Sequence, residues 1–448
     1  MTNNLSRSVI LISIVIVILS LMFFLPELQI SGVSLKKINL FSDIQKKEKK
    51  NLATKKIKQI YTDTCKANIS CYDDFSIDNN MMSYFYNAID SINILKKPIR
   101  IAYFGDSFIE GDLMTEDLRD TLQKLYGGEG VGIVPITSMV AGFRQSIRHS
   151  FANFKTYTVN DQFMYSLPIG IAGSTAIPDS GNYVNYKPVY NKRFLKIFHH
   201  IRLFYQNNSE ALVRYNVNSS QIITKNLEQG NGLQCLELNQ DSVKSVTFRF
   251  TGAPRLYGVS FDSKEGIYVD NFATRGNSGF GLLRTPDRLY QSFDSLLNYK
   301  LVVIHYGLNV VSRNCKKYDW YKQTMKKAIE HIKSSFPQCS ILLVSVSDRS
   351  TRIEGEYVTM PEIPLFIDTQ RELAKETGVV FWNLFDAMGG ENSIVDFANQ
   401  KPPLANKDYT HLNYRGGRKI ANIFTETLLF EKSKFDRKKS VEKNNKSL

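Results

Sequence analysis

Two residue types that many catalytic and metal sites use are scarce in this chain. Its 448 residues include six His and five Cys, and no two Cys form a Cys-x-x-Cys pair. This spacing disfavours a structural zinc site, which usually draws on closely paired thiolates. Cys65 and Cys71 lie six residues apart and could bridge. One or two disulfides would fit an extracytoplasmic compartment, although an odd number of Cys leaves the pairing open.

Several familiar motifs are also missing. Residues 127–132 are rich in glycine, but they lack the Gly-Lys-Ser/Thr ending of a phosphate loop and the spacing of a dinucleotide fingerprint. No Gly-x-Ser-x-Gly elbow occurs, which disfavours the α/β-hydrolase architecture. The chain contains no internal repeat. We therefore expect no cofactor and no metal.

The net charge of +14 is concentrated at the two ends of the chain. Residues 36–58 hold nine Lys against Asp43 and Glu48, and residues 431–448 hold six Lys and one Arg against three acidic residues. The remaining body is near neutral, so we expect no nucleic-acid partner. The basic ends suit a solvated stalk or tail near anionic lipid or wall polymer, or simply increase solubility.

An uncharged, apolar stretch at residues 8–25, ended by Pro26, is long enough to span a bilayer. A cleaved signal peptide is the alternative, but no small-x-small cleavage site follows Leu25. We therefore predict an N-terminal transmembrane helix that anchors the protein in the membrane, with the catalytic part extracytoplasmic (periplasmic). Arg7 precedes the stretch while Lys36 and Lys37 follow it, so the positive-inside rule leaves the orientation open.

The order of predicted strands and helices indicates an α/β core that is interrupted once. Apolar runs that suit buried strands occur at 99–104, 301–304, 340–346 and 379–382, and they alternate with helical patterns at 113–126, 318–336, 365–376 and 415–430. Such alternation indicates a parallel sheet. Between residues 131 and 265 the pattern changes to alternating strands separated by Asn, Ser and Gly, which is typical of a β-sandwich.

The predicted organisation has six parts. They are a membrane anchor (1–30), a Lys-rich linker followed by an amphipathic helix (31–97), a first core segment (98–130), an inserted β-sandwich (131–265), a second core segment (266–431) and a basic disordered tail (432–448).

Three residues offer the parts of a nucleophilic site. Ser107 follows the strand at 99–104, in a strand-to-helix turn that can present its hydroxyl at the carboxyl edge of a parallel sheet. A serine needs a base, and His411 differs from the other five histidines because Asp408 stands three residues before it. That spacing lets the carboxylate orient the imidazole, leaving Nε2 to face Ser107. Taken alone, Asp-x-x-His is a common pattern.

A tetrahedral intermediate also needs donors aimed at its oxyanion. The candidates are the backbone N–H groups of Ser107 and Gly276 and the side-chain amide of Asn309. Taken singly, Gly276 and Gly307 are equally well explained as ordinary turn glycines. Glu110 and Asp112 could form an acid–base pair of the glycosidase type, but a structural role is favoured because they neighbour the nucleophile.

Taken together, these patches resemble the SGNH/GDSL hydrolase superfamily. The matching positions are Gly105-Asp-Ser-Phe-Ile-Glu-Gly111, Gly276, Gly307-Leu-Asn309 and Asp408-Tyr-Thr-His411. The resemblance implies a three-layer α/β/α SGNH-type core, a Ser107–His411–Asp408 triad and metal-independent ester hydrolysis. It also implies that the insert is similar to a carbohydrate-binding module, as in bacterial peptidoglycan O-acetylesterases of this superfamily.

The predicted function is therefore a serine esterase that removes O-acetyl groups from an acylated cell-envelope glycan such as peptidoglycan. An O-acetyltransferase working with a membrane-bound O-acyltransferase would use the same triad, and residues 105–112 resemble envelope proteins associated with such partners. A lipase or lysophospholipase and a glycan-binding protein without activity are the remaining alternatives.

Overall fold

A computed structural model describes residues 2–24, 29–30, 33–34, 65–66, 69–161, 167–189 and 198–446. The chain divides into two compact units, Met1–Ile60 with Asn444–Leu448, and Tyr61–Lys443. The Lys-rich stretch at residues 36–58 lies outside the described residues.

The first unit contains helix α1 (Thr2–Phe24) and the two short antiparallel strands β1 (Gln29–Ile30) and β2 (Val33–Ser34). Helix α1 corresponds to the membrane anchor predicted for residues 1–30. None of the helices in the described residues combines the length and the apolar character that a bilayer-crossing segment needs.

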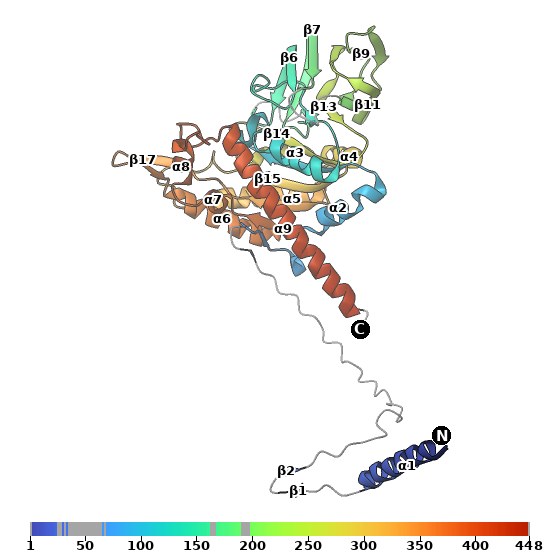
Figure 1. Cartoon of the computed structure of the whole chain (residues 1–448). Helices are drawn as coiled ribbons and strands as arrows, with labels where there is room; N and C mark the ends of the chain where they lie inside the picture. Colours follow the sequence, from blue (N-terminus) through green and yellow to red (C-terminus); the bar gives the residue numbers. More distant parts are fainter. Residues whose placement is uncertain are drawn as a thin grey trace. The chain divides into compact units, whose positions relative to one another are not determined.

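A six-stranded sheet forms the centre of the second unit (Figure 1). Its order is β14 (Ile267–Ala273), β4 (Ile99–Gly105), β15 (Tyr299–His305), β16 (Ser340–Val344), β19 (Val380–Trp382) and β3 (Asp73–Asp74). All pairs are parallel except that of β3 with β19. The central strands are buried on both faces, which explains their unbroken apolar runs. The predicted parallel α/β core is confirmed.

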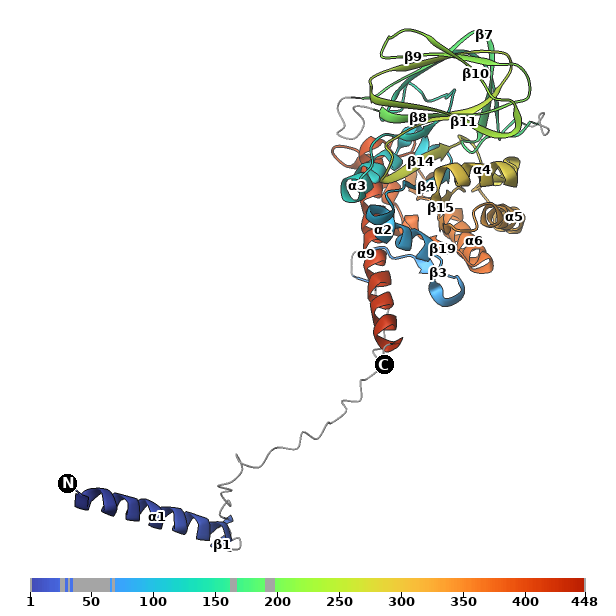
Figure 2. The same cartoon turned by 90° about the vertical axis from the view of Figure 1, so that its right-hand side faces the viewer.

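Helices cover both faces of this sheet (Figure 2). On one side lie α2 (Ser83–Leu95), α3 (Thr115–Tyr126) and α9 (Tyr414–Lys446), and on the other α4 (Asp287–Leu297), α5 (Asp319–Ser335) and α6 (Glu362–Thr377). Successive residues of β4 show the two layers, because the Tyr103 ring contacts Phe424 of α9 whereas the Phe104 ring contacts Tyr290 of α4.

Shorter elements complete the core. They are the helices α7 (Leu384–Met388) and α8 (Ser393–Asn399), the 3-10 turns η1 (Ile77–Asn79), η2 (Ser107–Asp112) and η4 (Phe280–Arg284), and the hairpin of β17 (Ser350–Ile353) with β18 (Glu356–Thr359).

Nine antiparallel strands between β4 and β14 in the sequence form a second sheet. They are β5 (Gly132–Val134), β6 (Arg148–Thr158), β7 (Ser174–Lys187), β8 (Phe198–Asn207), β9 (Leu212–Val217), β10 (Ile223–Asn226), β11 (Gly230–Val243), β12 (Val246–Thr251) and β13 (Arg255–Asp262). This sheet has its own hydrophobic cluster, which includes Val184, Phe248 and Phe261. The strands fall where the sequence predicts them, within residues 131–265, while the assignment of this segment as an inserted sandwich domain stays a prediction.

A buried ionic network joins the two sheets. Arg100 of β4 lies 2.5 Å from Asp262 of β13 and 2.9 Å from Asp270 of β14, and Arg202 of β8 also binds Asp262 at 2.9 Å. Burial alone would lower the pKa of Arg100, but the two carboxylates outweigh it and raise the pKa above its ordinary value. The guanidinium is therefore charged, and it ties the nine-stranded sheet to the core.

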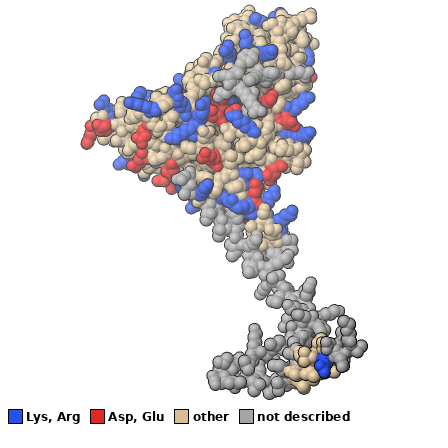
Figure 3. Space-filling model, viewed as in Figure 1, with Lys and Arg blue, Asp and Glu red and all other residues tan. Residues whose placement is uncertain are grey.

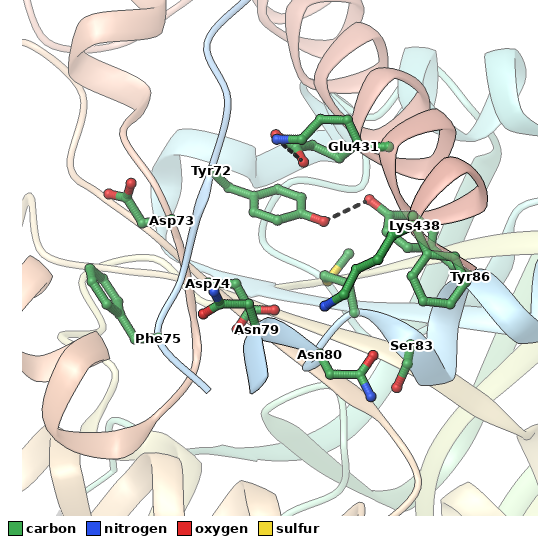
Figure 4. Close-up of a pocket in the computed structure, with 13 residues that line it drawn as sticks. Tyr72, Asp73, Asp74, Phe75, Asn79, Asn80, Ser83, Tyr86, Glu431 and Lys438 are labelled. Carbon is green, nitrogen blue, oxygen red and sulfur yellow. Dashed lines mark hydrogen bonds and ion pairs between the residues drawn. The ribbon is translucent and has the colours of Figure 1, made fainter. Parts of the chain in front are cut away.

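The disordered tail predicted for residues 432–448 is wrong for the described part, because α9 continues to Lys446. The Lys432 ammonium lies 2.6 Å from both Asp90 of α2 and Asp436, and the Phe435 ring centroid lies 5.5 Å from that of Tyr86. Lys432, which the sequence alone would place in a solvated tail, is therefore paired with carboxylates in the structure. A pocket of about 400 Å³ lies where α9 meets α2 and β3 (Figure 4). None of the proposed site residues lines this pocket.

Cys65 and Cys71 form a disulfide. Cys235, Cys315 and Cys339 are free thiols. The bridge is the short one that the sequence suggested, and it lies directly before β3 in the chain.

Charged side chains of both signs are interspersed over the face of the molecule in Figure 3.

Candidate active site

The turn after β4 places Ser107 at the carboxyl edge of the parallel sheet. A Cβ at Gly105 would lie 2.8 Å from Cδ1 of Ile109 and 3.1 Å from the His305 carbonyl oxygen, so the strand end has no room for a side chain. The Asp106 carboxylate then caps η2 by accepting the Phe108 N–H at 2.9 Å. These two features fix the half-buried Ser107 as the first residue of the turn.

Three of the predicted site residues come together in a hydrogen-bonded chain. The Ser107 Oγ lies 3.0 Å from His411 Nε2, and His411 Nδ1 lies 2.8 Å from Asp408 Oδ2. The other carboxylate oxygen, Oδ1, accepts the backbone N–H groups of Thr410 and His411, each at 3.0 Å. Asp408 therefore holds both the imidazole and the loop that carries it.

Asp408 is suited to remain ionised. Partial burial raises its pKa, but the hydrogen bonds from the His411 backbone and imidazole outweigh burial and hold the pKa below the ordinary value. An ionised Asp408 fixes the imidazole tautomer, and it would stabilise an imidazolium if His411 took a proton from Ser107.

Gly276 lies in a loop that is tied to the serine turn. The Thr274 N–H donates to the Gly105 carbonyl oxygen at 2.9 Å, and the Arg275 guanidinium binds the Glu110 carboxylate at 2.9 Å through Nε. Gly276 itself has a φ of +73°, and nothing lies within 4 Å of the place of a Cβ. Glycine therefore serves the backbone conformation here, and the place of its missing Cβ is open space.

Asn309, just after β15, faces the same region but is not a free donor. Its Nδ2 donates to Asp106 Oδ2 at 3.0 Å and to the Asn277 carbonyl oxygen at 3.1 Å. A side-chain amide has two N–H groups, so both are engaged. An oxyanion would have to replace one of these acceptors, and the role of Asn309 stays a prediction.

Asp106 is a site residue that the sequence did not reveal. Its side chain is 2% exposed, and burial raises its pKa to about 6 despite the hydrogen bonds from Phe108 and Asn309 and the neighbouring charge of His411. The one feature of the sequence that could have pointed to Asp106 is its position between Gly105 and Ser107. Asn277, whose carbonyl accepts from Asn309, gave no signal of its own.

Glu110 and Asp112 have structural partners, as their neighbouring positions suggested. Asp112 is fully buried and binds Arg119 at 2.8 Å and Arg144 at 3.1 Å. Burial raises the pKa of Asp112, but the two guanidinium groups outweigh burial and hold the pKa far below its ordinary value. Asp112 therefore has no proton to give, which removes the acid–base pair of a glycosidase.

The other five histidines have partners away from Ser107. His305 lies 3.2 Å from the Tyr103 hydroxyl, and burial lowers its pKa to about 3. The remaining four contact protein groups: His149 the Ile136 carbonyl, His199 Glu129, His200 Glu237 and His331 Asp287. Within the described ranges, no group of three His, Cys, Asp or Glu side chains is placed to hold a metal ion.

Comparison with solved structures identifies the fold. The chain is similar to a peptidoglycan O-acetylesterase with a TM-score of 0.66 and 20% identity, over 81% of this chain and 99% of that one. It also matches the YXIM protein of Bacillus subtilis (TM-score 0.31, 13% identity, 63% and 90% of the two chains) and a family two carbohydrate esterase of Cellvibrio japonicus (0.26, 9%, 64% and 99%). No protein-family model matches the chain, and no curated protein does. The protein has an SGNH hydrolase-like fold.

Proposed function

We propose that the protein is a serine esterase that removes O-acyl groups, O-acetyl in particular, from a cell-envelope polysaccharide such as peptidoglycan. The observation that carries this proposal is the chain of hydrogen bonds from Ser107 through His411 to Asp408. It joins a nucleophile, a base and an orienting carboxylate, which are the groups that ester cleavage through an acyl-enzyme requires.

In this mechanism His411 Nε2 takes the Ser107 proton as the hydroxyl attacks the acyl carbonyl. The N–H groups of Ser107 and Gly276 stabilise the oxyanion, and the amide of Asn309 joins them by exchanging one of its two acceptors for the oxyanion. His411 then protonates the leaving sugar hydroxyl, and the acyl group remains on Ser107. Water, deprotonated by His411, attacks this ester. The bond from the acyl carbon to Ser107 Oγ breaks, His411 returns the proton to Oγ, and the carboxylic acid leaves.

Two observations support a polysaccharide as the substrate. A solved structure that aligns over 81% of this chain, with a TM-score of 0.66, is a peptidoglycan O-acetylesterase. In addition, the nine-stranded sheet is tied to the catalytic core through Arg100 and Asp262, which gives a polymer a second sheet to contact. We also propose an extracytoplasmic location, which the Cys65–Cys71 disulfide supports because such bonds persist in oxidising compartments.

The direct test is acetate release by the full-length protein from O-acetylated peptidoglycan and from an aryl acetate, with Ser107→Ala as the control. We expect both activities in the natural chain and neither in the variant. Acetylated products should be measured in the same reactions after addition of a glycan acceptor. Predominant transfer of acetyl to the acceptor would replace the hydrolase by a transferase, and a preference for long acyl chains would replace it by a lipase.

A further inference from the structure

We propose that a groove beside the triad holds the sugar unit next to the acylated one, so that the enzyme acts within a polysaccharide chain. This inference rests on the proposed function. The groove, called here the flanking groove, has a volume of about 290 Å³, and its lining includes Glu110, Thr137, Met139, Thr156, Asn160 and Arg275. Ligand pockets usually span roughly 300–1,000 Å³, so it suits a small portion of a polymer.

The flanking groove is lined by residues that neighbour the catalytic motifs in the sequence. Glu110 belongs to η2, three residues after Ser107, and Arg275 immediately precedes Gly276. Their ion pair, 2.9 Å from Nε to Oε2, leaves the Arg275 side chain 62% exposed to the groove. A ligand on this guanidinium would therefore lie one residue from a proposed oxyanion donor.

The nine-stranded sheet supplies the opposite wall and is hydrogen-bonded to the same loop. Asn160, just after β6, donates from Nδ2 to the Arg275 carbonyl oxygen at 2.8 Å, and its Oδ1 accepts from Asn277 Nδ2 at 3.2 Å. The Asn277 carbonyl in turn accepts from Asn309. Asn160, which a sugar in the groove would contact, is therefore connected by hydrogen bonds through Asn277 to the Asn309 amide.

A loop at residues 138–144 closes the rim. Arg144 anchors it through Asp112 at 3.1 Å, and the Phe143 ring centroid lies 5.0 Å from that of Tyr414, three residues after His411. Met139 on this loop lines the groove and is 93% exposed. The loop therefore reaches from the groove to the histidine motif and offers an apolar side chain to solvent at the rim.

The lining combines polar and apolar groups, as a site for a sugar ring requires. Hydroxyls, an amide and a guanidinium lie beside the apolar side chains of Pro135, Val140 and Phe151. Thr137 and Thr156 share a hydrogen bond of 2.7 Å. A pyranose ring presents the complementary surface, with hydroxyls at its edge and C–H groups on its face.

The test uses the full-length Ser107→Ala protein, which leaves esters intact, in calorimetric titration with O-acetylated peptidoglycan tetrasaccharide and O-acetylated xylotetraose. Adding Met139→Ala or Asn160→Ala should weaken binding of at least one probe about tenfold, which is 1.4 kcal/mol. Both residues are exposed, so neither change should unfold the protein. The matched control is Arg288→Ala, an exposed arginine on α4, which should leave affinity unchanged.

The same changes in the active protein give a second measurement, the ratio of kcat/KM for the acetylated polymer to that for an aryl acetate. The ratio should fall about tenfold in the groove variants. If the affinity and the ratio were both unchanged in the groove variants, the proposal that the groove binds a sugar would be wrong, while the proposed esterase function would stand. The same conclusion would follow if neither probe bound. Groove-dependent binding by a protein that cleaves no ester would instead overturn the proposed function.

Discussion

The residues around Ser107 hold one another in place through hydrogen bonds. Asp408 binds the His411 imidazole and its backbone N–H, and Asp106 caps the serine turn while holding the Asn309 amide. The arrangement is therefore preorganised by hydrogen bonds between charged and neutral groups, which are stronger than those between neutral groups.

Asp408→Asn tests the orienting carboxylate. We expect kcat for an aryl acetate to fall roughly 10⁴-fold, because an asparagine stabilises the wrong imidazole tautomer and cannot balance an imidazolium. KM should change little, since Asp408 does not contact the substrate in the mechanism. Steady-state kinetics check this, and a loss of less than tenfold in kcat would contradict the role of Asp408.

The raised pKa of Asp106 predicts a pH-dependent stability. Its value of about 6 in the folded protein exceeds that of an unfolded aspartate, so the folded state binds the proton more tightly. This contribution to the free energy of unfolding is fully present below about pH 4 and is lost as the pH rises through about 6. The loss amounts to about 3 kcal/mol.

Asp106→Asn removes the titration of the Asp106 carboxyl. The difference in unfolding free energy between the natural protein and the variant should therefore change by up to about 3 kcal/mol between pH 4 and 7. Urea denaturation at a series of pH values measures it. Parallel stability curves for the two proteins would show that the Asp106 pKa is not raised.

At the scale of elements, the strands and helices of the core could be predicted from their apolar periodicity. The runs that predict β4, β15 and β16 are buried on both faces, and that burial produces the pattern. The two-residue β3 carries no such pattern, and it exists because its backbone pairs with β19. Likewise, Asn309 donates to Asp106 and to the Asn277 carbonyl oxygen, and these three residues lie in loops far apart in the sequence.

The C-terminal part of α9 shows the same limitation. Lys432, Lys438 and Lys439 suggest a solvated tail, but each donates to a group on η1 or α2, at Asp90, Asp78 and Asn87 respectively. Their partners lie more than three hundred residues earlier in the chain. A charge pattern alone does not contain this information.

Phe435→Ala tests the docking of α9. The Phe435 ring is half-buried against Tyr86, so its loss should lower the free energy of unfolding by about 2 kcal/mol, less than for a fully buried phenylalanine. The control Arg437→Ala, on an exposed position of the same helix, should stay within about 0.5 kcal/mol. Equal stability of the two variants would contradict the packing of this segment.

At the scale of the whole molecule, the Arg100 network makes the two sheets depend on each other. Arg100→Met leaves the buried Asp262 and Asp270 without their main cation. Breaking a buried ion pair in this way typically costs about 3–5 kcal/mol, and we expect a loss of that size in urea denaturation. Lys155→Met, at an exposed position of β6, is the control. A loss below about 1 kcal/mol would show that Arg100 does not couple the sheets.

The central claim is that Ser107 carries the acyl group between two half-reactions. Intact-protein and peptide mass spectrometry, after rapid acid quenching of full-length protein with an aryl acetate, measures this directly. We predict a mass increase of one acetyl group on the peptide that contains Ser107, and its absence in Ser107→Ala. Ester hydrolysis that continues at the natural rate in Ser107→Ala, or an acetyl group on another residue only, would contradict the account.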